Sequence, residues 1–336
     1  MAAARMRARS VLAGNGTSSR YPIGGAHAKV YTGHLGQDVR CLSLSGNGGS
    51  AMGEMKSVVV TGASTGIGYG IARVLGRNAI QVFGSVRKQA DADRLRRELG
   101  ETFIPLLMDV TDEGSVQAAA AVVSEQLDGR KLFGLVNNAG IAGGGPLLHQ
   151  PIAEFRQTLE VNLVGPFTVT KAFGPLLGAD RTRKGPPGRI VQISSVGGRF
   201  GAPFLGSYVA SKFGLEGMSE SLRRELLLYG IDVIVVGPGS VKTPIFDKAQ
   251  KTDLSQYNNT EYAPILKGFI EYFLSESKKG LEPQRIGETV FKALTTRKPK
   301  VRYAVVPQRL KNWTLPMTLP RRLVDRMIGK QSGLLK

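Results

Sequence analysis

Cysteine and histidine are scarce in this sequence, which has one cysteine and three histidines among its 336 residues. The single Cys41 cannot form an internal disulfide, and it excludes a Cys-rich metal site. His27, His34 and His149 lack the spacing of metal ligands, so we expect no metal centre. We place His149 in a loop or at the rim of a pocket.

Long apolar runs are also absent. No segment approaches the about 18 consecutive apolar residues that a membrane-spanning helix needs. Hydrophobic residues make up 42% and charged residues 21%, which are ordinary values for a globular protein. A chain of this length can form one large domain, or one domain with extensions, around a sizeable core.

Acidic residues are depleted at both ends of the chain, where most of the formal net charge of +19 arises. Residues 1–54 contain six Lys/Arg and two acids, and residues 297–336 contain eleven Lys/Arg and one acid. The ends contribute +4 and +10, so the middle carries only +5. Because the basicity lies in the tails, we expect no nucleic-acid groove across the main domain.

The first 54 residues show no sustained helical or strand periodicity and are rich in Arg, Gly, Ser and Ala. This composition is typical of an organellar transit peptide, which predicts targeting to a chloroplast or mitochondrion. A disordered extension without a targeting role, in a cytoplasmic or membrane-associated protein, has the same composition. In either case we expect the leader to stay outside the core, and a domain to extend from residue 55 to residue 307.

Short β-branched runs alternate with helix-length stretches throughout that domain. The runs are continuously apolar, as strands buried on both faces of a sheet require. Alternation of this kind predicts right-handed βαβ crossovers, and hence a Rossmann-type, doubly wound parallel sheet of about seven strands flanked by helices in a single α/β domain. The predicted strands are 57–64, 80–86, 102–110, 132–140, 189–195, 231–239 and 302–307.

A glycine-rich turn, "TGASTGIG" at 61–68, joins the first predicted strand to the first predicted helix. Its glycines follow G-x-x-x-G-x-G, a variant of the usual dinucleotide fingerprint. Gly62 permits a tight turn, Gly66 lets the backbone approach a pyrophosphate, and Gly68 lets the helix pack on the sheet. The helix N-terminus then presents free N–H groups to the phosphates. Its place after the first strand favours cofactor binding over an ordinary turn.

The second predicted strand indicates which nicotinamide cofactor is used. An acid at the end of this strand would bind the ribose 2′-OH of NAD(H). Here Val86 holds that place, and Arg87 and Lys88 follow it. These cations favour NADP(H), with NAD(H) as the alternative cofactor, although a solvated helix start would have the same residues.

Tyr208 and Lys212 are four residues apart in "SYVASKFGLEGM", so a helix presents both on one face. A nearby ammonium favours tyrosinate and would lower the tyrosine pKa from about 10 into a useful range. Thirteen residues earlier, Ser195 ends a predicted strand where ligands bind in open α/β sheets. An ordinary amphipathic helix, with Tyr208 on the surface, fits the same spacing.

Six motifs in order identify the chain as similar to the classical short-chain dehydrogenase/reductase family, nearest the branch of retinol and hydroxysteroid dehydrogenases. The resemblance covers about residues 56–250. The motifs are "TGASTGIG" (61–68), "NNAG" (137–140), Asn162 in "VNLVG", "ISS" (193–195), "YVASK" (208–212) and "PGSVKT" (238–243).

The resemblance implies four catalytic residues. Tyr208 would exchange a proton with the substrate oxygen, and Lys212 would hold the nicotinamide ribose and depress the tyrosine pKa. Ser195 would orient the substrate, with Ser194 the weaker choice. Asn162 would anchor a water of the proton relay through a break in its helix.

The same resemblance implies the contacts to the cofactor. Asp109 would sit against the adenine, Asn137 would support the fourth strand, and Thr243 would meet the nicotinamide carboxamide. The expected cofactor-binding residues are Gly62, Ser64, Thr65, Gly66, Ile67, Gly68, Arg87, Asp109, Val110, Asn138, Ala139, Gly140, Tyr208, Lys212, Pro238, Gly239, Val241 and Thr243. Pairing of subunits through the helices that contain Asn162 and Tyr208 would give a homodimer or homotetramer.

The substrate segment is expected at about 241–285, where apolar and aromatic side chains predict a hydrophobic small-molecule substrate, a lipophilic alcohol or its ketone or aldehyde. Some of these apolar and aromatic side chains would instead pack the helices onto the sheet. These residues are Ile245, Phe246, Tyr257, Tyr262, Ile265, Phe269, Tyr272 and Phe273.

The C-terminal tail, 308–336, mixes basic and apolar residues, so it could lie on an anionic membrane surface or cover the substrate pocket. Together these features predict an NADP(H)-dependent oxidoreductase. A catalytically weak, dinucleotide-binding redox sensor or scaffold is the alternative.

Overall fold

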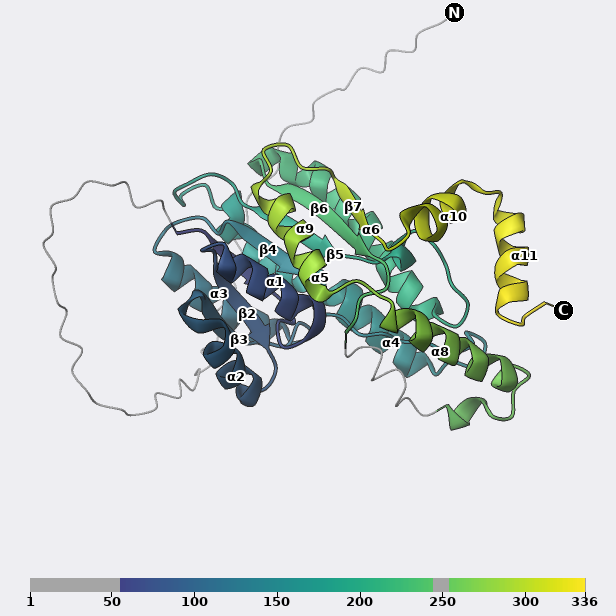
Figure 1. Ribbon diagram of the computed structural model, residues 1–336. Helices are drawn as coiled ribbons and strands as arrows, with labels where there is room; N and C mark the ends of the chain where they lie inside the picture. The colour runs from purple at the N-terminus through teal and green to yellow at the C-terminus, as the bar shows by residue number, and fades with distance from the viewer. Residues whose placement is uncertain (1–54, 244–253, 336) are drawn as a thin grey trace, which may run out of the picture. The chain divides into compact units, whose positions relative to one another are not determined.

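A computed structural model describes residues 55–243 and 254–335 (Figure 1). The expected leader, 1–54, and part of the expected substrate segment, including Ile245 and Phe246, lie outside the described residues. No helix within the described ranges is long and apolar enough to cross a membrane.

The centre of the domain is a seven-stranded parallel sheet with the order β3-β2-β1-β4-β5-β6-β7. Every residue of β1 and β4 is buried, which explains their continuously apolar sequences. The predicted doubly wound fold is therefore confirmed. The strands are β1 Ser57–Val60, β2 Gln81–Val86, β3 Phe103–Leu107, β4 Gly134–Asn137, β5 Arg189–Ile193, β6 Asp232–Pro238 and β7 Arg302–Val305.

The strands are shorter than predicted, mainly at their carboxyl ends. Residues 61–64 and 138–140 follow β1 and β4 as turns and loop rather than as strand. They include the first half of the glycine-rich turn and the last three residues of "NNAG", so both motifs lie where the hydrogen-bonded ladder ends.

Helices cover both faces of the sheet (Figure 1). One core joins the strands to α1 Gly66–Arg77, α2 Gln89–Leu99 and α9 Pro283–Thr295. The other joins them to α3 Glu113–Leu127, α5 Gly165–Gly174 and α6 Gly206–Glu225. The helix after β1 and the helices after β4 thus lie on opposite faces.

The helical segment between β4 and β5 contains two irregular turns. Its regular parts are α4 Ile152–Leu159 and α5, and a π-helical turn, Glu160–Val164, joins them. A second π-helical turn, Pro175–Ala179, follows α5. The first of these turns contains Asn162.

The expected substrate segment also contains regular structure. It includes α8 Ala263–Lys278 and the start of α9, which packs against α1 and was not predicted. The C-terminal segment forms a π-helical turn, Leu310–Thr314, followed by α10 Leu315–Thr318 and α11 Arg321–Gln331. Short 3-10 helices lie at Gly100–Thr102, Val196–Gly198, Leu226–Tyr229 and Ser255–Tyr257.

Candidate active site

The carboxyl ends of the strands bring the predicted site residues to one edge of the sheet. All strand pairs are parallel, so the segments after β1, β2, β3, β4, β5 and β6 emerge at the same edge. The chain reverses its direction of progress across the sheet between β1 and β4. Such switch points are where open α/β sheets bind ligands.

The glycine-rich turn after β1 is compact because two glycines have no side chain. Gly62 adopts a φ of +65°, and its N–H donates to Ser85 Oγ at 2.9 Å. A Cβ at Gly68 would lie 2.1 Å from the carbonyl oxygen of Gly62 and 2.5 Å from Asn138 Nδ2. The turn can therefore fold tightly over the start of α1 only with glycine at position 68.

The N-terminus of α1 offers hydrogen-bond donors to an anion. Thr65 is its N-cap but makes no side-chain cap, and the first turn contains no acidic residue. The first N–H groups of a helix have no partner within it, and they carry the positive end of its dipole. Together with the glycine turn, this end fits a dinucleotide pyrophosphate. Ser64 and Ile67 flank it and are half-buried.

The loop after β4 is fastened to the glycine-rich turn. The Thr61 hydroxyl oxygen accepts hydrogen bonds from the N–H groups of Asn138 and Ala139, each at 2.9 Å. The Asn138 side chain donates in return to the Thr61 carbonyl oxygen at 2.9 Å. Asn137 is buried in β4 and donates to Thr170 Oγ1 on α5 at 3.0 Å, in accord with its expected structural role.

Charged residues lie at the ends of β2 and β3. Arg87 is exposed, whereas Asp109 is half-buried and Val110 is buried. A hydrogen bond from the Thr111 backbone N–H lowers the pKa of Asp109, and the Thr111 hydroxyl and the Arg87 charge act in the same direction against burial. Arg87 is thus near the side chain expected at the adenine.

Sequence reasoning missed another cation at this end of the site, in addition to Arg87 and Lys88. Arg94 on α2 donates from Nη2 to the carbonyl oxygen of Ser64 at 2.7 Å, and it pairs with Asp91 at 3.0 Å. Nothing in its spacing from the glycine-rich turn indicated this contact, which depends on how α2 packs beside α1.

The structure brings Ser195 and Tyr208 together. Ser195 follows β5 and Tyr208 lies in the first turn of α6. A Cβ at Gly197 would lie 3.4 Å from Ser195 Oγ and 3.3 Å from Cε1 of the Tyr208 ring, so the two side chains border the same place. The Ser195 hydroxyl oxygen also accepts from the N–H of Gly197 at 3.0 Å. Two hydroxyl groups are therefore held side by side at the carboxyl edge of the sheet.

Lys212 lies one turn after Tyr208, and its side chain reaches back to β5. Its Nζ donates to the carbonyl oxygen of Ile193 at 3.0 Å and lies 5.8 Å from the centroid of the Tyr208 ring. Burial lowers the pKa of Lys212 from 10.5 to about 8, and the charge of Glu216 opposes this shift. The ammonium can thus lose its proton close to neutral pH.

The pKa of Tyr208 differs from the sequence-based expectation. Burial raises the pKa of Tyr208 above its ordinary value of 10.0, and the hydrogen bond with Ser195 opposes the shift. The expected lowering by Lys212 is therefore not found, because desolvation of the phenol dominates and the Lys212 ammonium is directed to a backbone carbonyl.

Asn162 connects the loop after β4 to α6. It is completely buried in the π-helical turn, where its Oδ1 accepts from the Ile141 N–H at 2.8 Å. Its Nδ2 donates to the Ile141 carbonyl oxygen at 2.9 Å and to Ser211 Oγ at 3.1 Å. A Cβ at the exposed Gly140 would lie 3.2 Å from Asn162 Oδ1 and 3.8 Å from Lys212 Nζ, so these groups border one space.

The segment after β6 completes this edge. Pro238 ends β6, the N–H of Gly239 donates to the Val305 carbonyl oxygen at 2.9 Å, and Val241 is buried. Thr243 is half-buried. Within residues 55–243 and 254–335, no group of three or more His, Cys, Asp or Glu side chains could hold a metal ion.

Comparison with known proteins places this arrangement in a family. The family model described as "short chain dehydrogenase" matches residues 56–254, which is more than half of the chain. The chain belongs to the short-chain dehydrogenase/reductase family. The resemblance noted from the six sequence motifs is thereby confirmed.

Two curated relatives are similar over most of this dehydrogenase/reductase. It is 37% identical over 276 residues to the NADPH-dependent 3-dehydrocapnine reductase of Ornithobacterium rhinotracheale, covering 82% of this chain and 97% of the relative. It is 34% identical over 283 residues to human retinol dehydrogenase 5, covering 81% and 87% respectively. The chain is thus an oxidoreductase of the retinol dehydrogenase-like branch, acting on CH–OH donors.

The fold is also found in solved structures. A short-chain dehydrogenase/reductase from Burkholderia phymatum, in complex with NAD, superimposes with a TM-score of 0.68 at 21% identity, covering 82% of this chain and 95% of the other. This likeness supports the seven-stranded parallel sheet described above.

Proposed function

We propose that this enzyme interconverts a lipophilic primary or secondary alcohol and its aldehyde or ketone, with NADP(H) as cofactor and Tyr208 as the acid/base. The neighbouring side chains of Ser195 and Tyr208, with Lys212 one turn away, carry this proposal. They lie at the same sheet edge as the glycine-rich turn. Relatives that are named as a reductase and a retinol dehydrogenase support the reaction class.

The residues have distinct roles in this reaction. When bound, the nicotinamide cofactor gives a hydride to the carbonyl carbon or takes one from the alcohol. During reduction the Tyr208 hydroxyl gives its proton to the carbonyl oxygen as that oxygen gains charge, and during oxidation tyrosinate takes the proton back. Ser195 holds the same oxygen by a second hydrogen bond.

The proton supplied to Tyr208 would come by way of Lys212. The pKa of Lys212, about 8, lets its amine carry or release a proton near neutral pH, which suits a group beside an acid/base. Asn162 holds the neighbouring loop against α6 and leaves Lys212 bordering the space at Gly140. The family resemblance implies a further role for Asn162, the anchoring of a water of the proton relay.

Replacement of Tyr208 by Phe tests the proposed chemistry. The Tyr208→Phe variant retains the ring but has no proton to exchange, so we expect turnover to fall at least 100-fold while the variant still binds NADPH. The assay follows NADPH oxidation with a panel of lipophilic carbonyls that includes all-trans-retinal, a 3-ketosteroid and a long-chain methyl ketone. Unchanged turnover would contradict the mechanism. NADPH binding without turnover by the unmodified enzyme would favour the redox sensor or scaffold instead.

The preference for NADP(H) over NAD(H) is proposed from Arg87. This exposed cation follows β2, and its charge lowers the pKa of Asp109. The reductase relative is named as NADPH-dependent. NAD(H) remains the alternative cofactor, since the Burkholderia structure is a complex with NAD. We expect Arg87→Asp to weaken NADPH binding at least tenfold relative to NADH.

A matched control for this substitution is Arg77→Asp, which makes the same change of charge at an exposed residue in the last turn of α1. Fluorescence titration with both cofactors measures the two variants. Equal loss of NADPH preference in both would assign the effect to net charge and not to a contact with the 2′-phosphate.

An aromatic cluster that includes Phe204, just before the start of α6, supports the proposal of a lipophilic substrate. Phe204 and Tyr257 are buried, and Phe204 lies 5.1 Å from Phe269 and 5.9 Å from Tyr262, both in edge-to-face geometry. The ring centroids of His149 and Tyr262 lie 5.9 Å apart, so His149 lies beside this cluster. Since Phe204 is only four residues before Tyr208, the cluster can surround the apolar part of a substrate.

Association of two or four subunits through α5 and α6 is proposed from exposed apolar side chains on these helices. Phe167 on α5 is 55% exposed and Phe213 on α6 is 45% exposed. Burial of such surface favours a homodimer or homotetramer. Light scattering after size-exclusion chromatography measures the assembly, and a monomer at micromolar concentration would contradict it.

The C-terminal helix α11 is proposed to contact a membrane surface. Leu323 and Met327 are 45% and 54% exposed and lie four residues apart, with Arg322, Arg326 and Lys330 close by in sequence. Such a helix can lie on an anionic bilayer. Flotation with vesicles containing phosphatidylserine tests this contact, and equal binding to neutral vesicles would contradict it.

Organellar targeting by residues 1–54 is a further proposal, supported by their basic composition. A fusion of these residues to a fluorescent protein tests it, and a diffuse cytoplasmic signal would contradict it.

A further inference from the structure

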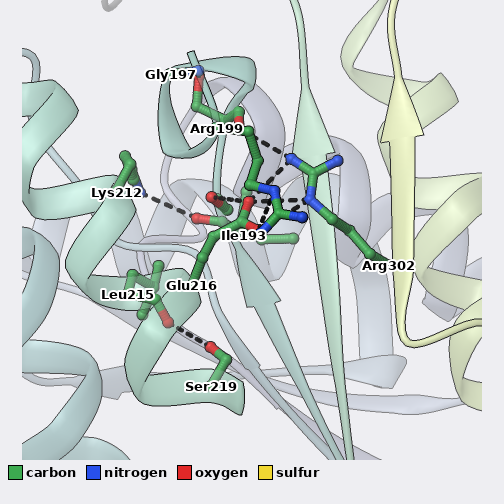
Figure 2. A network of polar contacts seen from close by, with 10 residues as sticks. Ile193, Gly197, Arg199, Lys212, Leu215, Glu216, Ser219 and Arg302 are labelled. Atoms are coloured by element: carbon green, nitrogen blue, oxygen red, sulfur yellow. Dashed lines mark hydrogen bonds and ion pairs between the residues drawn. The ribbon is translucent and has the colours of Figure 1, made fainter. Parts of the chain in front are cut away.

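A buried ion pair lies beside the proposed catalytic residues (Figure 2). Glu216 on α6 and Arg302 on β7 are 86 residues apart in the sequence. Arg302 Nη2 lies 2.9 Å from Glu216 Oε1, and Arg302 Nε lies 2.9 Å from Glu216 Oε2. Only 8% of the Glu216 side chain and 15% of the Arg302 side chain are exposed. Because taking both charges out of water costs free energy, such a pair is weak evidence for a stabilising role alone.

The pair holds two consecutive residues at the carboxyl end of β5. Glu216 Oε1 accepts a hydrogen bond from the Ser194 hydroxyl at 2.8 Å. Arg302 Nη2 donates to the carbonyl oxygen of Ser195 at 3.2 Å. One partner thus binds the side chain before Ser195, and the other binds the backbone of Ser195 itself. This also gives Ser194 a role distinct from that of Ser195.

Gly198 packs closely on these contacts. A Cβ at Gly198 would lie 2.5 Å from Ser194 Oγ and 2.9 Å from Glu216 Oε1. The short 3-10 helix Val196–Gly198 therefore packs directly on the bond between Ser194 and Glu216. A shift of Ser195 would have to break this bond or the one to Arg302.

Other charged groups around the pair are few within the described residues. Arg199 Nε lies 4.0 Å from Glu216 Oε2, and its side chain is 51% exposed. Lys212 lies one turn before Glu216 on the same helix and donates to Ile193 (Figure 2). The centroid of the Trp313 ring lies 4.6 Å from the guanidinium carbon of Arg302. Arg302 thus contacts both an aromatic ring and a carboxylate.

We propose that Glu216 and Arg302 are positioning residues for the hydride-transfer reaction, because their ion pair fixes the Ser194–Ser195 segment and thereby keeps the Ser195 hydroxyl beside Tyr208. The inference rests on the proposed function of Ser195 and Tyr208. A reacting oxygen must be held at hydrogen-bond distance from both hydroxyl groups, and a displacement of about 1 Å in such a site can cost about 100-fold in rate. The forked guanidinium of arginine suits this task, since it can bind a carboxylate and a carbonyl oxygen together.

The first test needs no substrate. Arg302→Lys keeps the charge but loses the fork, so one ammonium cannot replace all the donors of Arg302. Hydrogen exchange of the full chain, followed by mass spectrometry, should show peptides covering residues 193–200 exchanging at least tenfold faster. The amide of Ser194, bonded to Val236 at 2.8 Å, and that of Gly197 report this region.

Arg189→Lys is the matched control. Arg189 lies at the other end of β5, is partly buried, and likewise donates to two backbone carbonyl oxygens, those of Ala293 at 2.9 Å and Leu294 at 2.7 Å. In this variant, exchange of residues 193–200 should stay within twofold of the unmodified enzyme. Equal exchange in both variants would overturn the proposal.

The second test is a double-mutant cycle on turnover, with the carbonyl of the panel that the unmodified enzyme reduces fastest. We expect Arg302→Lys to lower kcat at least tenfold with KM changed less than twofold. In a Ser195→Ala background, where no hydroxyl is left to position, the same substitution should lower kcat less than twofold. A structural role would give the same loss in both backgrounds, and this result would overturn the proposal.

A second variant and an independent readout separate the remaining outcomes. Glu216→Gln keeps the volume of the side chain, and it should reproduce the faster exchange and the non-additive loss of kcat. Unfolding of both variants under conditions where Arg189→Lys is folded would make the pair structural and overturn the proposal. If the unmodified enzyme reduces no carbonyl, the proposed function fails, and the exchange experiment still decides whether the pair fixes residues 193–200.

Discussion

Replacement of Lys212 by methionine should make the stability of this enzyme less dependent on pH. Lys212 is only 5% exposed, and burial lowers its pKa from 10.5 to about 8. A shift of this size corresponds to a free-energy cost of about 3 kcal/mol for burying the charged form. Methionine has a similar length and no charge, so the Lys212→Met variant does not bear that cost.

The direction of the effect follows from proton binding. Below pH 8 the lysine is protonated in both the folded and the unfolded chain, so the folded enzyme bears the full cost. Between pH 8 and 10.5 the unfolded chain binds more protons, and stability therefore rises with pH. Between pH 7 and 9.5 we expect the unmodified enzyme to gain about 2 kcal/mol of unfolding free energy relative to Lys212→Met.

Urea unfolding followed by circular dichroism, at both pH values, measures this difference. Methionine cannot donate to the Ile193 carbonyl oxygen, which costs the variant about 1–3 kcal/mol at every pH and leaves the pH dependence unaffected. Lys242→Met, at a lysine with a 47% exposed side chain, controls for the change of net charge. The reasoning would be refuted if the difference in unfolding free energy between the unmodified enzyme and Lys212→Met changed by less than about 0.5 kcal/mol from pH 7 to pH 9.5.

Two further predictions concern the cofactor turn and the loop after β4. Gly68→Ala should weaken NADPH binding at least 100-fold, since the alanine Cβ would lie 2.1 Å from the Gly62 carbonyl oxygen. Fluorescence titration measures the NADPH affinity. An unchanged affinity would contradict the tight turn. Asn162→Ala should lower the free energy of unfolding by about 2 kcal/mol or more, since it removes partners of the Ile141 N–H and C=O groups and of the Ser211 hydroxyl. Urea unfolding tests this loss, and native stability in that variant would show that water replaces the amide.

The sheet and the glycine-rich turn could be predicted because both depend on local sequence. Continuous apolar runs identify strands that are buried on both faces, and all seven predicted strands are present. The turn at Gly62 and Gly68 is encoded by residues that lie next to one another. The meeting of Ser195 and Tyr208 follows because one ends β5 and the other begins α6.

Contacts between distant segments were not predictable in this way. Glu216 and Arg302 meet only because β7 pairs beside β6, and no local pattern marks Arg302 as the partner. The position of Glu216, four residues after Lys212, was a signal that it shares the buried face of α6. The family resemblance implied a break in the helix at Asn162, but the periodicity of its residues does not show the π-helical turn, because they fit a regular helix equally well.

The pKa of Tyr208 shows a different limit of sequence reasoning. The spacing of Tyr208 and Lys212 indicates that an ammonium is near, but it does not give the degree of burial. Burial acts on both groups, raising the pKa of the phenol and lowering that of the ammonium. Which of the two groups has the higher pKa therefore depends on packing that only the folded structure defines.

The aromatic ring that contacts Arg302 belongs to Trp313, which is the only tryptophan in the chain. Indole emission responds to nearby charge, and all tryptophan emission of this chain comes from Trp313. The tryptophan fluorescence of the unlabelled protein should therefore report the position of Arg302. The same emission overlaps the absorption of reduced nicotinamide, which would quench it by energy transfer. The chain thus contains its own optical probe, in contact with Arg302 of the ion pair, for following cofactor binding and the state of that pair in one measurement.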